Sequence, residues 1–148
     1  MTPILWALVA VAAVGLAYTL QFTSATLSFG RELSETDSAT GFQDAITPPW
    51  QTNLALFVYV AAVAIVIAMW WQAGWLSALG AAVGILVGSS LVKLVLPKPS
   101  DPHYKKLIVQ SMCSRYADYM RDGDVMRAEA MEHLLVKAGI DPDAFRRA

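Results

Sequence analysis

Two long stretches of the chain contain no charged side chain, and they set the pattern of apolar and polar positions. The first runs from Met1 to Gly30 and the second from Ala45 to Val92. All 11 basic and 12 acidic side chains fall in the two remaining segments, 31–44 and 93–147. Uncharged runs of this length, rich in Ala, Val, Leu, Ile and Trp, predict membrane-spanning helices.

The apolar stretches predict three transmembrane helices. Span one covers 3–22, which is roughly 30 Å at 1.5 Å per residue, or one hydrocarbon thickness. No Lys or Arg precedes it, so we expect a retained span and not a cleaved signal peptide. The second stretch is too long for one crossing, and Gly74 with the tryptophans around it marks a turn. Spans two and three are therefore expected at about 53–71 and 75–96, as a tight hairpin.

The polar C-terminal segment carries the signals of a helical hairpin. Asp101-Pro102 is a helix start, with Asp as N-cap and Pro at the first helical position. Gly123 suits the left-handed residue that ends this helix, and Asp124 caps the next one, over about 125–138. Further short helices are expected to start at Ser34 and at Asp141-Pro142.

The predicted fold class is an all-α membrane protein with three transmembrane helices, the second and third forming a tight hairpin, plus a C-terminal cytoplasmic helical hairpin. The predicted segments are transmembrane helix 1 (1–22), a polar cytoplasmic loop (23–52), a transmembrane helical hairpin (53–96) and a cytoplasmic helix-turn-helix tail (97–148). Thr52 or Asn53 is expected to cap the second span.

The distribution of cations predicts the orientation. With three spans, the loop at 23–52 and the C-terminal tail share one face, and that face receives every Lys and Arg. The positive-inside rule places it in the cytoplasm. We therefore expect an integral protein of the bacterial inner membrane, with its N-terminus outside and its C-terminus in the cytoplasm.

Small and aromatic residues mark expected packing and anchoring positions in the membrane. Gly80, Gly84 and Gly88 form a GxxxGxxxG stripe on span three, which lets another helix approach closely. The partner of this stripe is another span of the chain or another subunit. The expected interfacial anchors are Trp50, Trp70, Trp71, Trp75 and Lys93.

The cytoplasmic tail is expected to dock a partner. A hairpin of this size has little apolar area to stabilise it alone, so its apolar stripe should be covered by the loop at 23–52, by the membrane surface or by a partner protein. The predicted docking residues are Ile108, Met112, Tyr116, Met131 and Leu135. Lys98, Lys105 and Lys106 are expected to attract anionic lipid headgroups, by about 1 kcal/mol each.

No residue pattern in the chain specifies a reaction. The sequence has one cysteine, Cys113, and its two histidines, His103 and His133, lie far from it along the chain. A P-loop, a dinucleotide-binding GxGxxG and a zinc-ligand pair are absent, and the segment from Asp118 lacks two early calcium ligands. We expect no enzyme activity, cofactor, metal or nucleic-acid partner.

The sequence favours a small accessory or scaffold subunit of a larger membrane complex. Its partners would be other integral membrane subunits, a cytoplasmic protein and anionic lipid headgroups. The topology also resembles that of three-span phage holins, which implies a homo-oligomeric pore as the alternative. A small transporter subunit is a third hypothesis, disfavoured because the spans lack buried charge.

Overall fold

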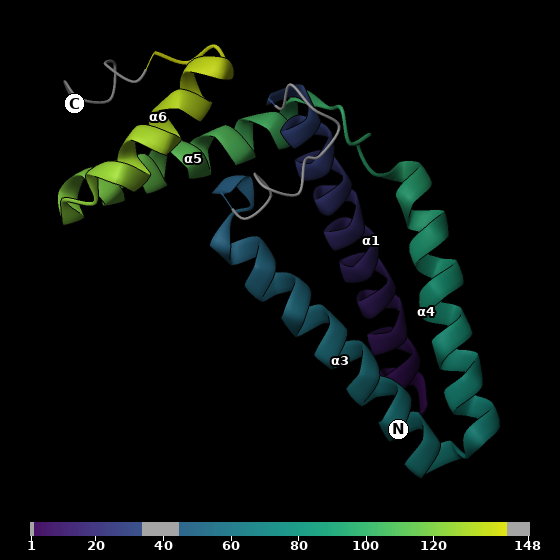
Figure 1. Cartoon of the computed structure of the whole chain (residues 1–148). Coiled ribbons are helices and arrows are strands. Elements are labelled where there is room, and N and C mark those ends of the chain that lie inside the picture. Colours follow the sequence, from purple (N-terminus) through teal and green to yellow (C-terminus); the bar gives the residue numbers. More distant parts are fainter. Residues whose placement is uncertain (1, 34–44, 142–148) are drawn as a thin grey trace. The chain divides into compact units, whose positions relative to one another are not determined.

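The described part of the chain, residues 2–33 and 45–141 of a computed structural model, is helical and contains no strand. Its helices are α1 (Thr2–Leu33), α3 (Pro49–Ala73), α4 (Trp75–Val95), α5 (Pro102–Asp122) and α6 (Val125–Lys137) (Figure 1). Three of them, α1, α3 and α4, are long and apolar enough to cross a membrane. The predicted all-helical class with three candidate spans is confirmed at this level.

The chain divides into two compact units. The apolar unit comprises Met1–Phe22 and Pro49–Lys98, and the polar unit comprises Thr23–Pro48 and Pro99–Ala148. Helix α1 contributes its first part to the apolar unit and its last part to the polar unit. The predicted division into four segments stays a prediction.

In the apolar unit, the first part of α1 packs against both α3 and α4. Figure 1 shows α3 and α4 meeting at a turn, with the purple start of α1 running between them. The turn is the single residue Gly74, whose φ of 84° is a conformation that side chains with a Cβ avoid. The core of this unit is a cluster of buried apolar side chains from all three helices: Leu5, Val9, Ala12, Leu16, Val58, Met69, Ala81 and Ile85.

Helix α1 is longer than the sequence interpretation expected. Span one was predicted to end at about Phe22, but the helix continues to Leu33 through residues assigned to a polar loop. Ala25, Phe29 and Leu33 recur at helical spacing, and all three are buried in the polar unit. This part of α1 thus contributes to the core of the polar unit, although the sequence interpretation assigned it to a polar loop.

Helix α3 starts earlier than expected. It begins at Pro49, so Thr52 and Asn53 lie inside the helix and the prediction that either caps it is wrong. Proline suits the first helical position because its missing N–H would have no partner there. The expected helix starts at Ser34 and Pro142 lie outside the described residues.

In the polar unit, local signals set the ends of α5 and α6. The Asp101 carboxylate accepts a hydrogen bond from the backbone N–H of His103 at 2.9 Å. Gly123, with φ of 74°, ends α5, and the Asp124 carboxylate then accepts from the N–H of Arg127 at 3.2 Å. The buried faces of α5 and α6, the end of α1 and Ile46 supply the core of this unit.

Candidate interaction surfaces

The glycine stripe of α4 faces α1 of the same chain. A Cβ added to Gly80 would lie 3.6 Å from the Trp6 ring, and one added to Gly84 would lie 3.5 Å from Val9 Cγ1. At Gly88 the added atom would lie only 3.1 Å from Ala13 Cβ. Of the two partners that the sequence left open, the structure therefore places α1 against all three glycines.

The expected interfacial anchors lie near the ends of the membrane-length helices. Trp70, Trp71 and Trp75 flank the Gly74 turn and are exposed. Trp50 is in the first turn of α3, where its ring meets that of Phe22 edge-on at 5.2 Å between centroids. Lys93 lies in the last turn of α4. Their position at a membrane interface stays a prediction.

The five residues predicted to dock a partner are buried inside the polar unit. Ile108, Met112 and Tyr116 of α5 and Met131 and Leu135 of α6 are each at most 3% exposed. The chain itself therefore covers these side chains, and a docking role for them stays a prediction. Because α1 continues into the polar unit and Ile46 is buried there too, the hairpin has a core within its own chain.

A different apolar set is exposed in the polar unit. Met120, Val125 and Met126 surround the Gly123 turn, and Met126 is 79% exposed. We call these three residues the apolar tip. Within the described part of the polar unit, Val136 is the one other large aliphatic side chain that is exposed. The sequence does not mark this tip, because the boundaries of α6 alone do not determine which of its edges is covered.

Arg115 joins α5 to the segment that precedes α3. Its guanidinium donates one hydrogen bond to the carbonyl oxygen of Ala45 at 2.8 Å and another to that of Thr47 at 2.6 Å. Ile46, between these two carbonyls, is 1% exposed. We call this arrangement the Arg115 clamp. It fixes the last residues of the polar unit before Pro49, and no sequence signal pointed to it.

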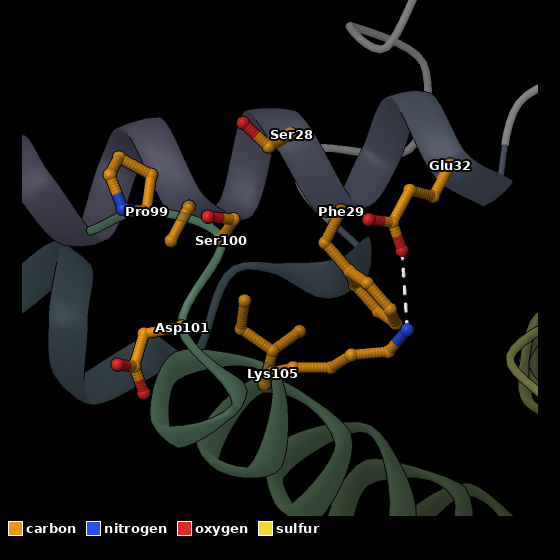
Figure 2. A pocket seen from close by; sticks show the side chains of 9 residues that line it. Ser28, Phe29, Glu32, Pro99, Ser100, Asp101 and Lys105 are labelled. Carbon is orange, nitrogen blue, oxygen red and sulfur yellow. Dashed lines mark hydrogen bonds and ion pairs between the residues drawn. The ribbon is translucent and has the colours of Figure 1, made fainter. Parts of the chain in front are cut away.

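Lys105, which was expected to contact lipid headgroups, has partners within the polar unit. Its Nζ lies 3.2 Å from Glu32 Oε2 and 5.2 Å from the centroid of the Phe29 ring. Figure 2 shows the Lys105 side chain reaching toward Glu32 beside the Phe29 ring. The three side chains border a small cavity of about 40 Å³ with Ser28 and Asp101, which has room for only a few water molecules. The ion pair is exposed, so we expect it to contribute less than about 1 kcal/mol.

Cys113 is a buried thiol, and we expect it to react slowly in the native protein. Burial raises the pKa of the Cys113 thiol, and a backbone hydrogen bond partly opposes this shift. A raised pKa leaves less thiolate at neutral pH, and thiolate is the nucleophile. Alkylation by iodoacetamide should be on the order of tenfold slower than after unfolding in dodecyl sulfate. The control is Ser114→Cys in a Cys113→Ser background, an exposed position that should react at the unfolded rate; equal native rates at the two sites would contradict this prediction.

An apolar groove of about 400 Å³ opens on the apolar unit. It is lined by one residue of α1, five of α3 and three of α4: Leu16, Tyr59, Ala62, Val63, Val66, Ile67, Ala82, Ile85 and Leu86. All of the lining surface of the groove is apolar. No sequence pattern indicates this groove, because it depends on the spacing between three helices.

The fold defines the class of the protein as all-helical, with three helices suited to a membrane. In residues 2–33 and 45–141, no three His, Cys, Asp or Glu side chains gather as ligands for a metal ion. Comparison with family models, with curated proteins and with solved structures finds no match for this chain.

Proposed function

We propose that this protein is a small, non-catalytic accessory subunit of a larger complex in the bacterial inner membrane. The first part of α1 and the hairpin of α3 and α4 would be the three spans, and the hairpin of α5 and α6 would lie in the cytoplasm. The distribution of Lys and Arg supports this orientation, with the N-terminus outside.

The observation that carries the proposal is the apolar tip. A small polar unit that buries most of its large aliphatic side chains leaves Met120, Val125 and Met126 exposed together beside one turn. Exposed apolar groups gathered in this way mark a contact with another protein. Methionine suits such a contact because its flexible, polarisable side chain adapts to the partner surface. The tip would therefore be the part of the hairpin that docks a cytoplasmic or peripheral component.

Helix α3 would supply the contact with other integral subunits. Only 11% of its most apolar stretch is buried in the chain, against 39% for α1. The glycine stripe of α4 already faces α1, so its contribution to assembly would be to hold α1 and α4 together. The surface offered to other membrane subunits would then come from α3.

The test is purification from native membrane in mild detergent, followed by mass spectrometry of the purified complex. We expect the wild-type chain to carry stoichiometric foreign subunits. The double substitution Met120→Ser and Met126→Ser should release the component bound at the tip, while Val136→Ser, a matched exposed position in the same helix as Met126, should retain it.

Two results would overturn the proposal. A closed assembly of this chain alone would favour the homo-oligomeric pore-former over the accessory subunit. Retention of every foreign subunit by the double variant would show that the tip does not dock them.

A further inference from the structure

We propose that the groove of the apolar unit binds one acyl chain of an anionic phospholipid, and that Lys93 holds the headgroup of the same lipid. This inference concerns the apolar unit alone and goes beyond the proposed accessory function, which it neither needs nor supports. It rests on the lining of the groove, its size and the position of Lys93.

The lining restricts the occupant to a hydrocarbon. The groove is entirely apolar, and it lies between the three helices that are suited to a membrane. Small side chains leave part of this space open, because Ala62 and Ala82 stand where α3 and α4 face the groove. Its borders at Val63, Ile67 and Leu86 are exposed, so a chain from the surrounding lipid reaches the groove without passing through the core.

The size of the groove favours a single hydrocarbon chain over a helix. A transmembrane helix about 10 Å wide and about 30 Å long occupies on the order of 2,000 Å³. The groove measures about 400 Å³, which is a volume typical of sites for small ligands. A helix of a second copy could cover the groove but could not enter it.

Lys93 provides the charge that an anionic headgroup needs. It follows Leu86 by seven positions and Ala82 by eleven, so all three residues share one face of α4. The rise from Ala82 to Lys93 is about 16 Å, which is close to the depth of one leaflet, half of about 30 Å. The apolar unit contains no Asp or Glu, and its cations are Lys93 and Lys98 at the same end of α4. A lipid whose tail fills the groove thus places its phosphate at the level of Lys93.

The experiment counts lipids on the full-length protein by native mass spectrometry. The purified protein is titrated with phosphatidylglycerol or with phosphatidylcholine carrying the same acyl chains. We expect one lipid per chain and about fivefold tighter binding of phosphatidylglycerol, the effect of one lysine near an anionic headgroup. Lys93→Gln should abolish this preference and leave the binding of phosphatidylcholine unchanged.

Two substitutions test the groove itself. Ala82→Phe should fill it and eliminate the binding of both lipids, and Ala62→Leu should do the same from the side of α3. Val83→Phe is the matched control, because Val83 is exposed and points about 100° away from Ala82 around the helix. Thermal unfolding of each variant shows whether it is folded. If Ala82→Phe does not fold, the lipid binding of Ala62→Leu decides the test.

Three outcomes overturn the inference. The first is lipid binding by a folded groove variant that equals the wild type. The second is a headgroup preference that Lys93→Gln leaves intact. The third is a wild-type protein that dimerises and groove variants that do not, since this result would assign the groove to self-association.

Discussion

Replacing Arg115 with alanine will loosen the segment at 45–48 within the polar unit and destabilise the protein by roughly 2–4 kcal/mol. The substitution removes two charge-assisted hydrogen bonds, to the carbonyl oxygens of Ala45 and Thr47. Both carbonyls flank Ile46, whose side chain is buried, so losing the clamp also weakens an apolar anchor. Hydrogen–deuterium exchange at residues 45–52, with thermal unfolding in detergent, measures the effect.

Two further variants make this prediction specific. Arg115→Lys keeps the charge but replaces the planar fork with one ammonium, so it should restore only part of the protection. Arg121→Ala removes an exposed ion pair with Asp118 on the same helix and should cost less than about 1 kcal/mol. If Arg115→Ala increases exchange at 45–52 no more than Arg121→Ala does, the clamp does not stabilise the segment that precedes α3.

The sequence predicts most helix ends in this protein because the residues that form them have local requirements. Gly74 and Gly123 stand where the structure ends α3 and α5, and both adopt a positive φ that favours glycine. Asp101 stands at the start of α5, where a carboxylate accepts a backbone N–H. Each of these signals acts within a few residues and needs no knowledge of the tertiary fold.

The sequence interpretation ended α1 too early because the apolar period beyond Phe22 is weak compared with the polar residues around it. Ala25, Phe29 and Leu33 carry a helical period, but Ser and Thr residues between them look like a connector in the sequence. This error had a consequence for the site. Without the end of α1, the sequence indicates no core for the α5–α6 pair, and Ile108 and Leu135 are then expected at a partner contact although the chain buries them itself.

The Arg115 clamp could not be found from the sequence at all. Its acceptors are backbone carbonyls, which every residue carries, so neither Ala45 nor Thr47 is marked by its side chain. The groove is hidden for a similar reason, because it depends on how closely three helices approach. The apolar tip is intermediate, since Val125 and Met126 are visible as apolar residues beside Gly123, but their exposure depends on which face of α6 is buried.

The glycine stripe gives the second large prediction, because its three positions differ in the space around them. Gly88→Ala will destabilise the apolar unit by about 1–3 kcal/mol, since the new methyl group would lie 3.1 Å from Ala13 Cβ. Neither carbon can rotate away, because both are bonded directly to helix backbones, so α1 and α4 must separate. Gly80→Ala is the matched control: its methyl group would meet the Trp6 ring at an ordinary 3.6 Å, and alanine favours the helix.

A double-mutant cycle then decides which partner the stripe has. Ala13→Gly removes the opposing carbon, so it should rescue Gly88→Ala, with a coupling energy of about 1 kcal/mol between the two sites. Thermal unfolding of the four proteins in one detergent provides the four free energies. Rescue would mean that α1 of the same chain occupies the stripe, leaving α3 as the free surface for other subunits. Additive effects of the two substitutions would instead mean that Gly88 does not pack against Ala13. The glycine stripe would then be a candidate contact between subunits.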